Sequence, residues 1–115
     1  MEYRRLGRSG LMVSELTLGT MNFGGPSDEA TSFQMIDKAL YCGINLIDCA
    51  NVYSEGRSEE IIGKALKLNG KRHDVLLTSK ACLPTSDRPN TRGNSRHNLI
   101  NSCTESLKRL QTDYI

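Results

Sequence analysis

Apolar residues along the chain follow two alternating patterns. Nearly continuous apolar runs at 16–19, 44–48 and 75–80 are typical of strands buried on both faces of a parallel sheet. After each run, apolar residues recur every three or four positions, which is the periodicity of a helix packed on one side. The alternation of strand and helix predicts βαβ units and therefore an α/β fold.

Polar caps and glycines mark the expected ends of three helices. The predicted N-caps are Ser27 or Asp28, Ser58, and Ser95, whose side chains can accept hydrogen bonds from free backbone N–H groups. Gly43 and Asn69-Gly70 stand where the first two helices should end. Glu59 and Glu60 fall in the first turn of the second helix, where the helix dipole favours carboxylates. The expected buried stripes are Ala30, Phe33, Ile36 and Leu40, then Ile61, Ile62, Ala65 and Leu66, then Leu99, Cys103, Leu107 and Leu110.

The two ends of the sequence carry extended segments. Residues 3–6 and 11–14 flank a turn-forming stretch with two glycines and a serine, which predicts a β-hairpin before the first βα unit. At the other end, Tyr114 and Ile115 read as the first residues of a fourth strand. The glycine-rich stretch 22–26 and the polar loop 81–94 are expected connections.

Composition and charge exclude several classes of protein. The chain has 115 residues, 37% of them hydrophobic and 24% charged, as in an ordinary globular protein of one domain at most. The net charge is only +2, and positive and negative residues are interspersed along the chain, so we expect no nucleic-acid interface. No apolar run approaches the ~20 residues of a membrane span, and no secretory signal is evident. The four cysteines have irregular spacing without a zinc pattern, which favours a reduced, cytoplasmic setting and argues against a metal site.

Candidate chemistry gathers at the ends of the predicted strands. The carboxyl ends of parallel strands lie on one face, which carries the active site in βα barrels. Gly19-Thr20-Met21 close the first strand, Asp48 the second and Lys80 the third, while Tyr53 lies in the loop after Asp48. Topology alone should therefore bring Asp48, Tyr53 and Lys80 together.

The three side chains form a plausible proton-transfer group. A lysine ammonium beside a tyrosine favours the phenolate and so eases proton release, and a carboxylate can hold that ammonium in place. Such a tyrosine could protonate a carbonyl oxygen while a hydride donor attacks the carbonyl carbon. A simpler interpretation remains open, in which Lys80 ends a strand in solvent, Asp48 forms a turn, and Tyr53 lies on the surface.

Several segments resemble the aldo-keto reductase family, and together they cover nearly the whole chain. The opening residues 3–14 and 18–24 are similar to the start of these enzymes. Residues 43–53 and 56–66 resemble the central signature, 77–80 the lysine-bearing strand, and 106–115 the helix that enters strand four. The likeness is greatest to the branch with bacterial general-stress-type reductases and potassium-channel beta subunits. It implies a (β/α)8 TIM barrel that reduces aldehydes and ketones with NADPH, without a Rossmann motif.

The resemblance also assigns roles to individual residues. Tyr53 is the expected proton donor, Lys80 its partner, and Asp48 the anchor of the lysine and a contact of the nicotinamide ribose. Gly19, Thr20 and Met21 match a turn near the nicotinamide. Cys49 replaces a common threonine, a change small enough to fit. The family's catalytic histidine is expected beyond Ile115, since His73 and His97 read as surface residues. The residues that mainly bind the cofactor phosphates in this family lie in the second half of the barrel.

The expected domain is therefore a partial one. A (β/α)8 domain has ~250 residues, so residues 1–115 should form the hairpin and about three βα units. We expect these residues alone to be marginally folded, to lack reductase activity, and to expose a strand edge through which copies could associate. The alternative function is a regulatory protein that senses cofactor or binds a partner, as channel beta subunits do. The sequence does not identify the carbonyl substrate.

Overall fold

A small parallel sheet organises the molecule. The computed structural model describes every residue from Met1 to Ile115. Strands β3 (Leu18–Gly19), β4 (Leu46–Asp48) and β5 (Leu76–Thr78) are hydrogen-bonded in sequence order, all parallel. The three segments fall within the apolar runs that predicted them, which confirms the α/β assignment. β5 ends earlier than expected, so Lys80 lies two residues beyond its last residue.

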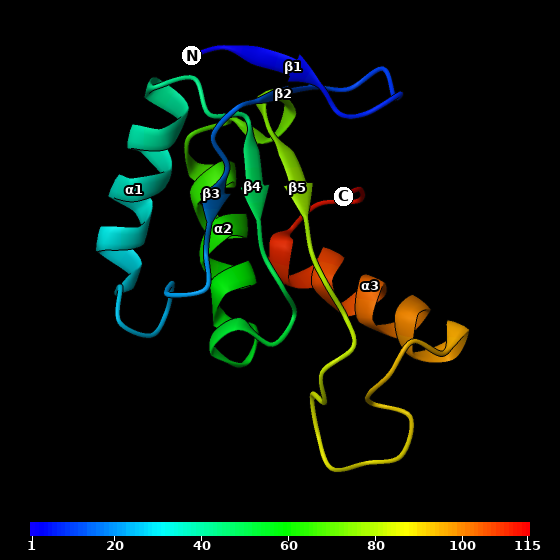
Figure 1. Cartoon of the computed structure of the whole chain (residues 1–115). Helices are drawn as coiled ribbons and strands as arrows, with labels where there is room; N and C mark the ends of the chain where they lie inside the picture. Colours follow the sequence, from blue (N-terminus) through cyan, green and yellow to red (C-terminus); the bar gives the residue numbers. More distant parts are fainter.

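Three helices follow the strands and pack beside the sheet. They are α1 (Glu29–Tyr41), α2 (Arg57–Leu68) and α3 (Arg96–Leu110), and single 3-10 turns, η1 (Tyr53–Gly56) and η2 (Arg72–Asp74), precede α2 and β5. Figure 1 shows α2 behind the sheet, α1 on the β3 side and α3 on the β5 side. The helices contact one another in the order α1, α2, α3. This is the βαβ arrangement that the alternating pattern predicted.

The core lies between the sheet and the helices. Its fully buried large side chains come from all three helices, from β4 and from the loop after β3; they are Phe23, Ile36, Ile47, Ile61, Ile62, Leu66 and Leu110. The predicted stripe of α2 is buried at all four positions. α2 is thus the central helix, packed on the sheet and on both neighbouring helices.

The predicted hairpin covers the beginnings of the strands. β1 (Tyr3–Arg5) and β2 (Met12–Ser14) pair in antiparallel register. Asn45, just before β4, accepts from the Ser14 N–H at 2.8 Å and donates to the Met12 carbonyl at 3.0 Å. Figure 1 shows this hairpin at the end of the sheet opposite the loops that follow the strands. The face carrying those loops is left free of the hairpin.

Capping of the helices agrees with prediction at two of three sites. Asp28 caps α1 and Ser95 caps α3 through their side chains. The expectation that Ser58 caps α2 is wrong: α2 begins at Arg57 after the left-handed Gly56, and no side chain caps it. Ser58 instead donates to the Thr20 carbonyl at 2.8 Å, inside the protein.

Two expected buried stripes and the last strand also need correction. Ala30 of α1 is exposed, because this helix turns Ser32, Ile36 and Ala39 inward. In α3, Leu99 and Cys103 are exposed, because Asn98, Ser106 and Leu110 are the buried positions. Tyr114 and Ile115 form no strand and pair with no neighbour in the sheet. Tyr114 stacks instead against the Arg72 guanidinium, 3.7 Å from the ring centroid.

Candidate active site

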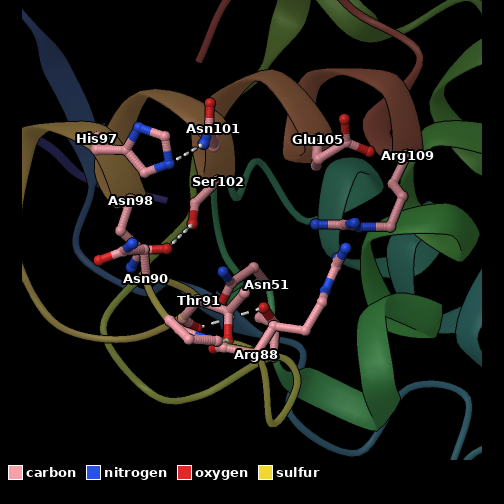
Figure 2. A pocket seen from close by; sticks show the side chains of 12 residues that line it. Asn51, Arg88, Asn90, Thr91, His97, Asn98, Asn101, Ser102, Glu105 and Arg109 are labelled. Carbon is pink, nitrogen blue, oxygen red and sulfur yellow. Dashed lines mark hydrogen bonds between the residues drawn. The ribbon is translucent and has the colours of Figure 1, made fainter.

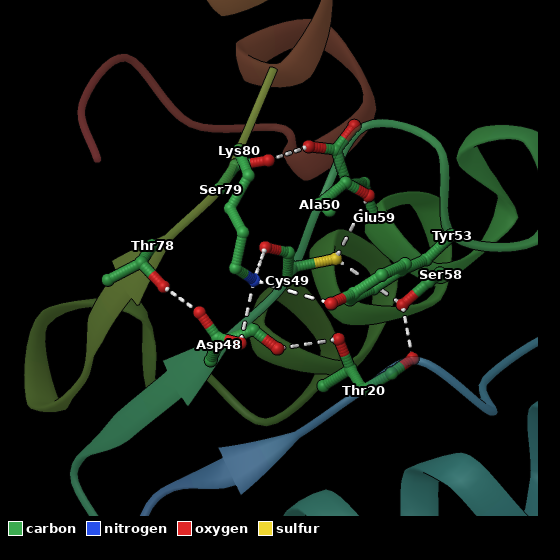
Figure 3. Close-up of polar contacts among 10 residues, drawn as sticks. All are labelled: Thr20, Asp48, Cys49, Ala50, Tyr53, Ser58, Glu59, Thr78, Ser79 and Lys80. Atoms are coloured by element: carbon green, nitrogen blue, oxygen red, sulfur yellow. Dashed lines mark hydrogen bonds and ion pairs between the residues drawn. The ribbon is translucent and has the colours of Figure 1, made fainter. Parts of the chain in front are cut away.

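Asp48, Tyr53 and Lys80 meet at the ends of the strands (Figure 3). The Lys80 Nζ donates to Asp48 Oδ2 at 2.7 Å, to the Cys49 carbonyl at 2.7 Å, and to Tyr53 Oη at 3.4 Å. The same ammonium lies 5.1 Å from the centroid of the Tyr53 ring. The three residues expected from topology are therefore in direct contact, with the lysine between the other two.

The sheet register explains why these residues converge. Gly19, Asp48 and Thr78 are adjacent across the three parallel strands. The Thr78 hydroxyl donates to Asp48 Oδ1 at 2.8 Å, so both carboxylate oxygens are engaged. Beyond Thr78 the chain stays beside the β4 segment, because the Asn51 N–H donates to the Lys80 carbonyl at 3.1 Å. Thr78 was not singled out in the sequence.

The ion pair sets the protonation states of its members. Burial alone would raise the pKa of the Asp48 carboxyl, but hydrogen bonds from Lys80 and Thr78 and the lysine charge outweigh it, and the pKa lies below its usual value. Burial alone would lower the pKa of Lys80, yet its bonds to Asp48 and Tyr53 raise it above the usual value. Both groups are thus charged at neutral pH.

The backbone turns sharply just after Tyr53. Ser54 and Glu55 have φ values of 49° and 56°, and Gly56 has a φ of 91°. Two consecutive left-handed residues that are not glycine cost about 1–3 kcal/mol each and are concentrated at functional sites. A Cβ at Gly56 would also lie 2.9 Å from Cδ of Arg109. This turn directs the chain into α2 while the Tyr53 ring packs against the core.

Gly19, Thr20 and Met21, at the end of β3 and just after it, divide into exposed and buried positions. Gly19 and Met21 are exposed, and a Cβ added at Gly19 would meet no atom within 4 Å. Thr20 is fully buried, donates through its hydroxyl to the Asp48 carbonyl at 2.9 Å, and accepts from Ser58. Gly19, which lies beside Asp48 in the sheet register, and Met21 are thus exposed, whereas Thr20 supports the Asp48 backbone.

A second polar group lies behind the lysine and escaped the sequence analysis. Glu59 is fully buried, and its carboxylate accepts from the Ser79 hydroxyl and from Arg109 Nε, both at 2.6 Å. From its sequence position, Glu59 was expected only to be an acidic residue in the first turn of α2. A signal was present: Glu59 precedes Ile62 and Leu66 by three and seven positions, which places it on the apolar stripe of α2.

A polar hollow of about 340 Å³ opens between α3 and the loop after β5 (Figure 2). Apart from Pro89 its lining consists of polar and charged residues, among them Asn51, Arg88, His97, Asn101 and Arg109. None of Asp48, Tyr53 or Lys80 lines it, so it is a neighbour of the site and not the site itself. The polar character of this loop, expected from the sequence, is confirmed.

The remaining cysteines, histidines and acidic residues form no second candidate site. The described residues contain no cluster of metal-ligating side chains. None of the helices combines the length and apolar character needed to cross a membrane. All four cysteines are free, and burial raises the pKa of the Cys49 thiol, which lies beside Ser58 as a small packing group. His73 and His97 are exposed, as expected, and contact Tyr114 and Asn101.

Comparisons with known proteins identify the family of the chain. The sequence profile of the aldo/keto reductase family matches residues 15–115. The chain is 48% identical to the uncharacterized oxidoreductase YrpG and 44% identical to the aldo-keto reductase YhdN, both of Bacillus subtilis. All of the chain is aligned in each case, covering 38% and 36% of these relatives. A probable voltage-gated potassium channel subunit beta of rice is 38% identical, with 35% of its length covered.

A solved structure gives the architecture. The chain superposes on the aldo-keto reductase AKR11C1 of Bacillus halodurans, in its holo form, with a TM-score of 0.87 and 38% identity. The match covers the whole of this chain and 38% of the reductase. The hairpin and the parallel βα units therefore correspond to the N-terminal portion of the reductase barrel. The chain spans little more than a third of the length of the relatives it matches. Because the family profile matches residues 15–115, the chain belongs to the aldo/keto reductase family.

Proposed function

We propose that this chain supplies the proton-donating part of an NADPH-dependent carbonyl reductase. The observation that carries the proposal is the position of Lys80, whose ammonium contacts both the Asp48 carboxylate and the Tyr53 hydroxyl. A salt bridge alone would not need the tyrosine, and here the ammonium is bonded to the phenol oxygen as well as to the carboxylate. The substrate class is an aldehyde or ketone, in keeping with the family.

Each residue has a distinct task in carbonyl reduction. The Tyr53 hydroxyl would donate its proton to the carbonyl oxygen as that oxygen gains negative charge. The Lys80 ammonium would stabilise the phenolate left behind, and Asp48 would keep the ammonium directed at the phenol. Bound NADPH would supply the hydride to the carbonyl carbon. General acid catalysis of this kind typically contributes about 10²–10⁴-fold to the rate.

The residues around Asp48 fit the nicotinamide end of the cofactor. Gly19 lies beside Asp48 in the sheet register, and the exposed residues Gly19 and Met21 form what we call the cofactor strip. The Asp48 carboxylate is still partly exposed, so it could also accept from a ribose hydroxyl. We expect Gly19 and Met21 to line the nicotinamide and Thr20 to act by supporting Asp48.

Replacing Tyr53 by Phe in the full-length protein tests the proposal. NADPH consumption with an aldehyde should fall by about 10²–10⁴-fold, because only the acidic hydroxyl is removed. Tyr41→Phe is the matched control, since Tyr41 is 84% exposed and lies in α1 away from the site. Unchanged turnover in Tyr53→Phe would refute the role of Tyr53 as proton donor.

A regulatory role is the second candidate, because relatives in rice and Arabidopsis are described as probable potassium channel beta subunits. A protein of that kind would combine slow turnover with tight retention of the cofactor. The reductase candidate instead requires a histidine on strand four and a basic phosphate site, both outside residues 1–115. In either case we expect a cytoplasmic protein with reduced cysteines.

A further inference from the structure

The Glu59 carboxylate is buried at a place where a carboxylate is costly unless it is fully bonded. Its side chain is fully buried in α2, among apolar neighbours such as Ile62. A buried charge persists only when charge and hydrogen-bond partners compensate for the lost water. Arg109 of α3 supplies the charge, and Ser79 supplies a hydroxyl donor, each at 2.6 Å. No buried polar atom of this group is left without a partner.

The position of Arg109 is fixed by two close approaches between elements. Gly56, at the start of α2, packs against the Arg109 side chain, where a Cβ would come within 2.9 Å of Cδ. Gly63 packs against the backbone of α3 at Arg109 and Leu110. The guanidinium is therefore held over the first turn of α2, and only about a quarter of the side chain is exposed.

Ser79 connects this buried group to the catalytic lysine. Successive side chains of an extended segment point to opposite faces, so Thr78 and Lys80 face Asp48 while Ser79 faces Glu59. Figure 3 shows the two sets of bonds on either side of the chain. The segment after β5 is thus held from in front by Asp48 and from behind by Glu59. The backbone on either side of Ser79 is bonded to the segment after β4, since the Cys49 N–H donates to the Thr78 carbonyl at 3.0 Å and the Asn51 N–H donates to the Lys80 carbonyl at 3.1 Å. The Glu59 contact adds the bond at the residue between them.

We propose that Glu59, acting through the Ser79 hydroxyl, is a positioning residue for Lys80. The inference rests on the proposed function, since it gives the buried Arg109–Glu59–Ser79 contacts a task in the same reaction. The purpose of the contacts is to keep the ammonium within reach of Tyr53, because misplacement by about 1 Å can cost up to about 10²-fold in rate. Glu59 and Ser79 touch neither substrate nor cofactor in this account.

Ser79→Ala in the full-length protein tests the inference with little disturbance of packing. We expect kcat to fall about 10- to 100-fold while KM for NADPH changes less than about twofold, because the cofactor strip is untouched. Ser79→Thr keeps the hydroxyl and should restore most of kcat. Glu59→Ala, which removes the acceptor of the Ser79 hydroxyl, should reproduce the loss. Ser32→Ala, which removes another buried serine hydroxyl in α1, is the control and should leave kcat unchanged.

A chemical readout separates this inference from the proposed function. Only a neutral amine is acylated, so Lys80 in its ion pair should react slowly with a succinimidyl ester, as measured by peptide mass spectrometry. Ser79→Ala should label Lys80 several-fold faster and leave Lys64, which is paired with Glu29, unchanged. Unchanged labelling of Lys80 together with unchanged kcat would overturn the inference, as would equal losses of kcat in Ser79→Ala and Ser32→Ala. If the wild-type protein shows no turnover, the proposed function fails, and the labelling alone decides the inference.

Discussion

Gly63→Ala should weaken the contact between α2 and α3. A Cβ at position 63 would lie 2.6 Å from both the Arg109 oxygen and the Leu110 carbonyl carbon. Carbon atoms pack comfortably at about 3.5 Å, so the helices would have to separate by about 0.9 Å. The obstructing atoms belong to the backbone, and no rotamer change can move them aside. Overpacking of this kind costs about 1–3 kcal/mol, with this site near the upper end.

Alanine is favoured over glycine in a helix by about 1 kcal/mol, which offsets part of the overpacking cost. We therefore expect a net loss of about 1–2 kcal/mol in the free energy of unfolding. Urea unfolding of the full-length protein, followed by circular dichroism, measures it. Gly10→Ala is the control, since a Cβ there meets nothing within 4 Å and its φ is not positive. Turnover should also fall, because Arg109 would move with α3. A Gly63→Ala protein as stable as wild type would refute the close approach.

Three further predictions concern the ion pair and the isolated segment. Lys80→Met should reduce turnover by about 10² or more while NADPH still binds in a fluorescence titration, because the phenolate loses its counter-charge. Asp48→Asn should lower the free energy of unfolding by only about 0.2–1 kcal/mol at neutral pH. The side chains of Lys80 and Asp48 are 50% and 36% exposed, and solvent weakens an ion pair that is exposed to this extent. Its pH dependence follows from the two shifts. The pKa of Asp48 is lowered from 3.8, so the stabilisation by the ion pair is present above pH 3.8 and is lost as the pH falls through the lower pKa of the folded state. The pKa of Lys80 is raised from 10.5, so the same stabilisation is present below pH 10.5 and is lost as the pH rises through the higher pKa of the folded state. Urea unfolding of wild type and Asp48→Asn across this range should therefore differ by a constant amount between about pH 5 and about pH 10. Residues 1–115 alone should show no steady NADPH consumption with an aldehyde, and measurable turnover by that polypeptide would contradict the expectation that the rest of the barrel is required.

Local sequence rules predicted most of the framework. The apolar runs located all three parallel strands. The caps of α1 (expected at Ser27 or Asp28 and found at Asp28) and of α3 (Ser95) were predictable because their side chains bond to their own helices. The prediction failed at Ser58, where a long-range partner decides the geometry. Its hydroxyl is used by the Thr20 carbonyl, 38 positions away, and the left-handed Gly56 starts the helix instead.

The site was predictable to the extent that topology determines it. Parallel strands bring Asp48 and Lys80 to the same edge of the sheet independently of side-chain packing. In the structure the Lys80 Nζ and the Asp48 Oδ2 are 2.7 Å apart. The Glu59 contacts depend on the packing of α3 against α2 through Gly63, which no local pattern specifies. For the same reason the exposed positions Leu99 and Cys103 were expected to be buried: helical periodicity gives a stripe, but the partner determines which stripe is covered.

The central claim is that Tyr53 gives the proton during carbonyl reduction. Its most direct test is the single-turnover rate of NADPH oxidation in the full-length Tyr53→Phe protein at saturating cofactor and aldehyde, because slow cofactor release cannot mask that rate. We expect a loss of about 10²–10⁴-fold relative to Tyr41→Phe, with NADPH affinity unchanged. A Tyr53→Phe protein that oxidises NADPH as fast as Tyr41→Phe would contradict it.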